Sequence, residues 1–165
     1  MATVETPTDL FVHKLGATLT MEETILELLE ELEDKASDPK LQKQLQQHHT
    51  ETVQQIQNLR RIFDALGEAP EKRPCPPIEG LENEGRQMIK EVDEALIDSV
   101  ILGGVIETEH HEIAVYDVLI IQAEQMVDDD IVALLQENLE QEEATLDKAV
   151  KAAEQSAKQL VRQYS

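Results

Sequence analysis

ILGGVIETEHHEIAVYDVLIIQA, residues 101–123, carries an apolar stripe at helical spacing that two glutamates interrupt. The stripe consists of Ile101, Val105, Glu109, Glu112, Tyr116, Leu119 and Ala123. Steps of three and four residues keep these side chains on one face of an α-helix. A carboxylate on such a face is costly to bury unless it is paired, protonated or bound to a metal. Glu109 and Glu112 therefore mark a candidate site inside a helical core.

Three further stretches have the same pattern, apolar at both ends and polar in the middle. The first stripe is Leu15, Leu19, Glu22, Leu26 and Leu29. The second is Leu41, Leu45, His48, Thr52, Gln55, Leu59, Ile62 and Leu66, with Glu51 at its edge. The last is Ile131, Leu135, Asn138, Glu142, Thr145 and Ala149. Because every polar interruption falls near mid-helix, the four are expected to meet at one level of a bundle.

Turn and capping residues predict where these helices begin and end. Thr8 is expected to cap the first helix, and Asp38 to cap the second with Pro39 as its first helical residue. Gly67 is a typical stop after a helix. The expected segments are helices over about 8–36 and 39–66, a linker over 68–77, a short amphipathic helix over 78–91, a helix over about 93–127, a turn at 128–130 and a final helix to near the end.

These segments predict an all-α fold of one domain over residues 1–165. Four long helices, two short connections and one longer crossover describe a ferritin-like antiparallel four-helix bundle. The short extra helix lies in the crossover between helices two and three. With aromatic residues at 2% and no Trp, the expected core is aliphatic.

Charge and composition exclude several classes of function. Lys and Arg total 14 against 35 Asp and Glu, and the resulting net charge of -21 disfavours binding to nucleic acids and anionic membranes. The longest apolar run, Val100 to Ile106, contains two glycines and is too short to span a bilayer. The first residues include Glu5 and Asp9 and lack the apolar core of a signal peptide, so a cytoplasmic location is expected. A lone Cys75 excludes an internal disulfide and a cysteine-based zinc knuckle, and is interpreted as an inert or slightly exposed linker thiol.

Five carboxylates are candidate ligands of a two-metal centre. They are Glu22, Glu51, Glu109, Glu112 and Glu142. Hard oxygen ligands with an occasional nitrogen favour iron or manganese over a structural zinc. Tyr116 lies one turn beyond Glu112 and could hydrogen-bond a ligand carboxylate. Glu107 and His110 project to the opposite side of their helix and are interpreted as surface or dimer-contact residues.

Four motifs resemble the YciE/YciF-type ferritin-like family over nearly the whole chain. They are DLFVHKL (9–15) with MEETI (21–25), HHTETVQQIQNLRRIF (48–63), CPPIEGL (75–81) and EHHEIAVYDVL (109–119). The resemblance implies a four-helix bundle with a short extra helix, usually a homodimer, among bacterial stress-associated proteins. Apolar residues expected to be exposed near Val100 to Val105, with Gly103 and Gly104 permitting close approach, would form the dimer contact.

The wider rubrerythrin-like group implies Glu ligands from helices one and three and Glu-x-x-His motifs from helices two and four. This chain departs from that pattern, because Gln54 and Thr145 stand where the two histidines would be, and Leu146 replaces an Asp of the family. His48 or Gln55 would then supply a nitrogen or amide ligand near Glu51.

Three functions remain open from the sequence. The first is a metal-binding protein that reacts with oxygen or peroxide. The second is a non-catalytic dimeric stress protein with a vestigial site. The third is a helical interaction module whose buried carboxylates share protons.

Overall fold

Five α-helices account for most of the chain in a computed structural model, which describes residues 4–165. The helices are α1 (Pro7–Lys35), α2 (Pro39–Leu66), α3 (Pro76–Glu91), α4 (Ile97–Met126) and α5 (Asp129–Tyr164), with a 3-10 turn η1 (Glu94–Leu96) before α4. No strand occurs within residues 4–165, which confirms the all-α class. Residues 1–3, which belong to the stretch expected to lack a signal peptide, lie outside the described residues.

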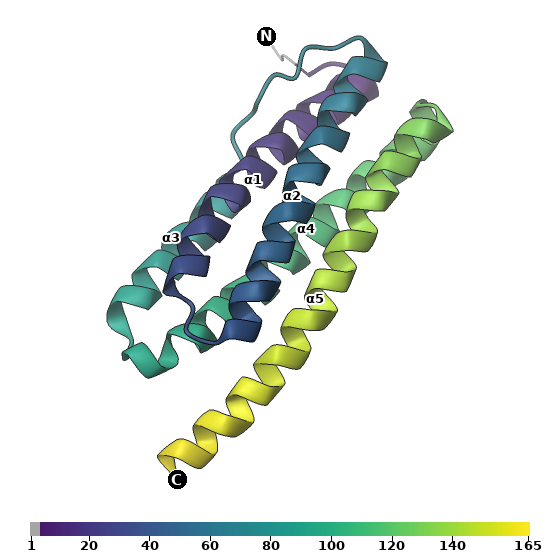
Figure 1. The fold of residues 1–165 in the computed structure, drawn as a ribbon. Coiled ribbons are helices and arrows are strands. Elements are labelled where there is room, and N and C mark those ends of the chain that lie inside the picture. The colour runs from purple at the N-terminus through teal and green to yellow at the C-terminus, as the bar shows by residue number, and fades with distance from the viewer. Residues whose placement is uncertain (1–3) are drawn as a thin grey trace.

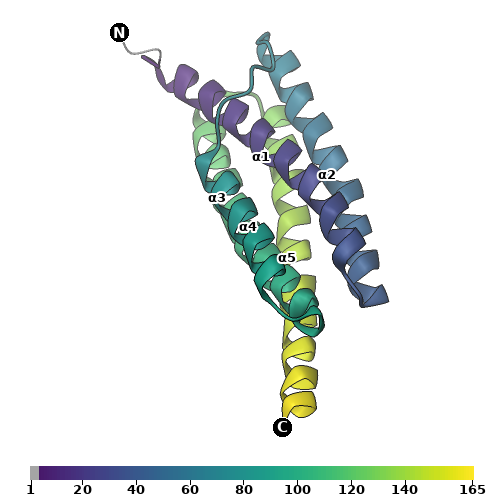
Figure 2. The ribbon, with the colours of Figure 1, turned by 90° about the vertical axis from the view of Figure 1, so that its left-hand side faces the viewer.

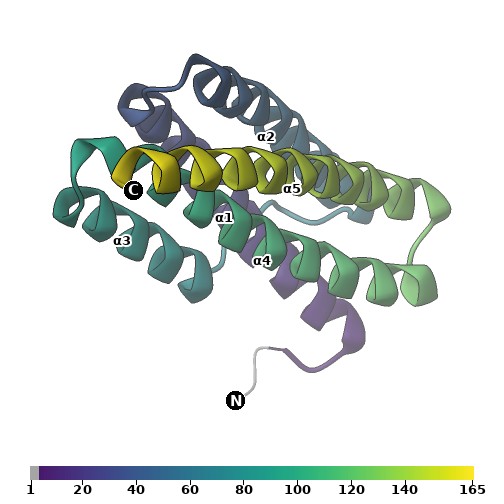
Figure 3. The same ribbon diagram turned by 90° about the horizontal axis from the view of Figure 1, so that it is seen from below.

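The four long helices lie side by side, and neighbouring ones run in opposite directions, whereas α2 and α4 run in the same direction (Figure 1). α1 packs against α2 and α4, and α5 packs against the same two helices, so each long helix has two long neighbours. The shorter α3 lies along α1 and α4 (Figures 2 and 3). The C-terminal end of α5 extends beyond the other helices (Figure 2).

The helix ends follow local capping chemistry, with one correction. α1 begins one residue before the predicted cap: Thr6, not Thr8, is the N-cap, and Pro7 is its first residue. The Thr6 hydroxyl accepts a hydrogen bond from the Asp9 amide (3.1 Å), and the Asp9 carboxylate accepts one from the Thr6 amide (2.9 Å). This reciprocal capping box decides the start. The predicted limits of α2 are confirmed, because Asp38 caps its start and Gly67 ends it with φ 69°.

The starts of α3 and α4 differ slightly from the predicted boundaries. The linker ends at Cys75, since Pro76 and Pro77 form the first turn of α3, where a missing N–H is harmless. Cys75 is the N-cap of α3 and is buried, so it is not a slightly exposed thiol. The regular α-helix α4 starts at Ile97 and not near Asp93, because η1 turns the chain first.

Asp98 at the start of α4 holds the turn between α1 and α2. Its carboxylate accepts hydrogen bonds from the Ser37 amide (2.8 Å), the Ser37 hydroxyl (2.7 Å) and the Asp38 amide (2.9 Å). Two neighbouring helices are therefore tied to a third at this end of the molecule.

The observed core differs from the predicted stripes at three positions. On α1, Ile25 is buried while Leu26 is only half-buried, because a straight helix of 3.6 residues per turn shifts the inner face. Leu66 and Val105 are half-buried as well. The expectation of an exposed apolar patch over Val100–Val105 is wrong, since every residue there is buried or half-buried. Among the described residues, no helix is long and apolar enough to cross a membrane.

Candidate metal centre

Four buried side chains from three helices converge at the centre of the molecule. His48 comes from α2, Glu109 and Glu112 from α4, and Glu142 from α5. Each offers one ligand atom, and these atoms all lie within 4.8 Å of one another. Glu109 and Glu112 reach the same point because residues three apart share a helix face.

The contact between His48 and Glu109 is close. The His48 Nε2 lies 2.8 Å from Oε1 of Glu109, but without the alignment of a hydrogen bond. Two ligand atoms bound at right angles to one ion with bonds of about 2.1 Å would be about 3 Å apart. The spacing therefore suits two ligands of a common cation. The Nδ1 of His48 has no hydrogen-bond partner.

The buried carboxylate oxygens of this centre lack hydrogen-bond donors. Both oxygens of Glu109, Glu112 and Glu142 are inaccessible to water and without a partner, as is Oε2 of Glu22. Oxygen atoms in this state favour a bound cation or a shared proton, since an unpaired buried charge is strongly destabilising. The donor set of carboxylates with one imidazole is compatible with iron or manganese.

Burial changes the acidity of these carboxyl groups. It raises the pKa of Glu109 to about 8, with further increases from the charges of Glu22 and Glu51. Burial, followed by repulsion from Glu142, raises the pKa of both Glu22 and Glu112 well above the usual value. The pKa of Glu142 is raised by burial and then by Glu109. Without a cation, protons would be retained at neutral pH.

Glu22 on α1 lies beside the four-residue cluster and is held by a hydrogen-bonded network. The Tyr116 hydroxyl donates a hydrogen bond to Oε1 of Glu22 and accepts one from the Asn138 side chain (3.1 Å). The side chain of Asn58 donates to that of Asn138 (2.8 Å). This network connects all four long helices. Tyr116 was expected to act on a ligand carboxylate, and the structure pairs it with Glu22.

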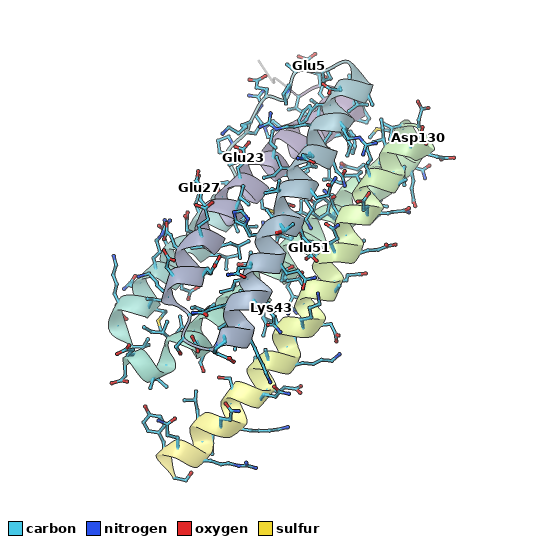
Figure 4. All side chains as sticks on the ribbon, viewed as in Figure 1. Glu5, Glu23, Glu27, Lys43, Glu51 and Asp130 are labelled. Carbon is cyan, nitrogen blue, oxygen red and sulfur yellow. The ribbon has the colours of Figure 1, made fainter. Side chains whose placement is uncertain are left out.

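The remaining two sequence candidates lie at the margin of the cluster. Glu51 is half-buried on the side of α2 that faces α5 (Figure 4). Its carboxylate accepts hydrogen bonds from Gln47 (2.9 Å) and Thr145 (3.3 Å). Gln55 is fully buried, and neither atom of its side-chain amide has a hydrogen-bond partner. Of the seven predicted site residues, four form the cluster, and Glu22, Glu51 and Gln55 do not belong to it.

A small cavity lies beside Glu51 and His48. Its volume is about 20 Å³, and its lining includes Glu51, His48 and Thr145. A cavity of that size is sufficient for one water molecule. Glu107 and His110 are exposed, as predicted from the helical spacing.

Comparison with known proteins identifies the family. The model of a domain of unknown function, DUF892, matches residues 6–162. The chain belongs to the DUF892 family. It is 31% identical to YciF of Escherichia coli K12 over 147 residues, which cover 88% of this chain and 87% of YciF. The resemblance read from the four motifs is thereby confirmed.

Two solved structures resemble this DUF892 protein closely. The crystal structure of the E. coli stress protein YciF has a TM-score of 0.88 at 28% identity and covers 93% of this chain and 98% of that one. YcfI from Rhodopseudomonas palustris has a TM-score of 0.86 at 34% identity, covering 89% and 94%. The all-helical fold is therefore shared with relatives.

One residue beside the candidate site of this DUF892 protein was not identified from the sequence. Asn58 is fully buried and bonded to Asn138. Its position three residues after Gln55 and four before Ile62 places it on the inner face of α2. That spacing could have indicated a buried polar residue at Asn58. Asn138, on the inner face of α5, is the partner that such a residue needs.

Proposed function

We propose that this protein holds a pair of iron or manganese ions at the centre of a ferritin-like four-helix bundle and reacts there with oxygen or peroxide. The observation that carries the proposal is the set of buried carboxylate oxygens without donors in Glu109, Glu112 and Glu142, next to the imidazole of His48. The ring of four long helices around this set supports the bundle architecture.

The charge balance favours two ions. Glu22, Glu51 and the three cluster glutamates carry about five negative charges when ionised, and two divalent ions would neutralise about four of them. The cluster would hold one ion. Glu22 Oε2, Gln55 and Glu51 offer oxygen ligands for a second. Bound iron or manganese supplies redox chemistry, because both metals change oxidation state readily.

The protein's own residues prepare the centre in three ways. Tyr116 and Asn138 fix the orientation of Glu22. The apolar residues at both ends of each helix exclude water from the carboxylates. The buried carboxyl groups retain protons until a cation displaces them, so metal binding is expected to release protons.

A second candidate function is a non-catalytic helical protein whose carboxyl groups share protons. The raised pKa values of Glu22, Glu109, Glu112 and Glu142 favour it, because protonated carboxyl groups can hydrogen-bond to each other without a metal. In that case the site would contribute to stability alone.

We further propose a homodimer formed through the outer face of α4. Val118 and Ile121 on this face are exposed, with Ile121 65% accessible. The inner face of α4 is apolar as well, and a helix that is apolar on both faces is typical of one that is buried on both sides.

The metal proposal is tested by thermal unfolding with and without manganese or ferrous ion. Ions should raise the melting temperature of the wild-type protein and release protons, because a ligand that binds only the native state stabilises it. Glu112→Gln should lose most of that increase. Its metal-free form should be at least as stable as wild type, since one source of repulsion is removed.

The matched control is Glu143→Gln, at an exposed position beside Glu142 on α5. It should respond to metal as wild type does. If metal stabilises none of these proteins and Glu112→Gln destabilises the metal-free form, the proton-sharing candidate is correct.

A further inference from the structure

A cavity of about 280 Å³ lies between α1, α3 and α4 and reaches the candidate metal centre. Its walls are aliphatic side chains from all three helices, among them Ile25, Leu81 and Ile101. His48 and Glu109, which are buried, mark its inner end. Glu84 and Glu107, which are exposed, mark its mouth.

Glycines keep this cavity open. Gly85 of α3 and Gly103 and Gly104 of α4 all line it, and a Cβ added to any of them would meet no atom within 4 Å. Close packing of helix backbones therefore does not explain the three glycines. Because glycine weakens a helix interior, their presence needs another reason. Larger side chains at these positions would project into the space.

The size and charge of the cavity define what it can hold. Engineered apolar cavities of about 150 Å³ bind benzene, so this one has room for a molecule of roughly six to twelve non-hydrogen atoms. A polypeptide segment is too large. Among residues 4–165, no Lys or Arg lines the cavity, while carboxylates lie at both its mouth and its inner end. An anionic ligand would be repelled and would lose its hydration without a partner.

The short helix α3 can admit a ligand. Ile78 is its one fully buried side chain, and Arg86 ties α3 to Glu31 of α1 through two contacts of 2.6 and 3.0 Å. Both partners are more than a third exposed, and ion pairs of that kind contribute little to stability.

We propose that this cavity binds a small uncharged molecule with an aliphatic body, such as a short-chain alcohol, with one end next to His48 and Glu109. The binding itself is independent of the metal proposal. If a metal is present, the ligand would lie beside two of its ligands, as a substrate or a modulator of the centre would.

The test uses protein freed of metal with a chelator and three probes with the same six-carbon chain. They are 1-hexanol, hexanoate and hexylammonium, titrated by calorimetry at neutral pH. Hexanol is expected to bind at one site, and hexanoate at least about tenfold more weakly. Contacts of hexanol with the Met88 methyl group in NMR spectra locate the site.

Gly104→Leu should weaken hexanol binding at least about tenfold by filling the cavity, with the helical circular dichroism unchanged. Gly80→Leu is the matched control, because Gly80 is exposed on α3 outside the cavity and should bind hexanol as wild type does. The proposal is overturned if wild type does not bind hexanol, if hexanoate binds equally well, if only hexylammonium binds, or if Gly104→Leu binds hexanol normally. Because no metal is present, these outcomes leave the test of the metal centre untouched.

Discussion

The hydroxyl of Tyr116 on α4 donates a hydrogen bond to Oε1 of Glu22 on α1, and both side chains are fully buried. Asn138 donates to the same hydroxyl. Oε1 of Glu22 therefore has a partner while Oε2 has none. The Tyr116 side chain thus decides which oxygen of Glu22 is free for a cation or a proton.

Tyr116→Phe should destabilise the metal-free protein by about 1–3 kcal/mol, since it leaves a buried oxygen of Glu22 without a partner and removes one of the two hydrogen bonds that the side-chain amide of Asn138 donates. Urea unfolding monitored by circular dichroism measures the change. Tyr164→Phe, at an exposed position, is the control and should be neutral. Equal stability of both variants would mean that the hydrogen bond has no energetic role.

The stability of the metal-free protein should fall as the pH rises. The buried carboxyl groups have higher pKa values in the native state than in the unfolded chain. For Glu109 the pKa rises from the usual value of 4.5 to about 8, so between these pH values the native state binds more protons than the unfolded state. Stabilisation is complete below pH 4.5 and is lost as the pH passes the native pKa. Melting temperatures at pH 5 to 8 check this.

Glu142→Gln should reduce that pH dependence, because it removes one of the carboxyl groups with a raised pKa. Glu143→Gln should leave it unchanged. A pH dependence as steep in Glu142→Gln as in wild type would assign the effect to the general acidity of the surface. Saturating manganese should reverse the slope in wild type, since a metal prefers ionised carboxylates.

Gly16→Ala should destabilise the fold by about 1–3 kcal/mol through overpacking. The Gly16 carbonyl accepts a hydrogen bond from the Arg73 amide (3.1 Å), and an added Cβ would collide with the carbonyl oxygen of Glu71. The linker would have to move away from α1. Gly80→Ala, in open space, should be neutral or stabilising by up to about 1 kcal/mol. Denaturant unfolding of the two variants separates these effects.

Ile121→Glu should shift the proposed dimer towards monomer, because it introduces a charge into the apolar outer face of α4. Val161→Glu, on the projecting end of α5, is the control, since Val161 is similarly exposed. Sedimentation at several concentrations reports the assembly. A monomeric wild-type protein would contradict the dimer, and dissociation by Val161→Glu alone would assign the interface to α5.

Periodicity and caps were sufficient to predict the helices and most of their limits. The inner faces of α4 and α5 were read correctly except at Val105, because the residues of each face repeat at steps of three and four. The first helix was assigned the wrong cap, since Thr6 and Thr8 both precede Asp9 and only the backbone shows which one pairs with it.

The site could be predicted only in part from the sequence. Each candidate was found as a polar residue on an apolar stripe, which is a property of one helix at a time. Glu51 at the stripe edge remains outside the four-residue cluster, because the angle and offset between α2 and α5 determine how far it reaches.

By itself the sequence determined that this chain forms long helices, which face of each is buried, and that carboxylates interrupt those faces, because these follow from local periodicity and capping. Only the tertiary structure decided that His48 joins Glu109, Glu112 and Glu142, and that Tyr116 pairs with Glu22. It also decided that Gly103 and Gly104 border a cavity beneath α3 and not an exposed patch. These relationships depend on the distances between helices, which side chains far apart in the sequence set by packing together.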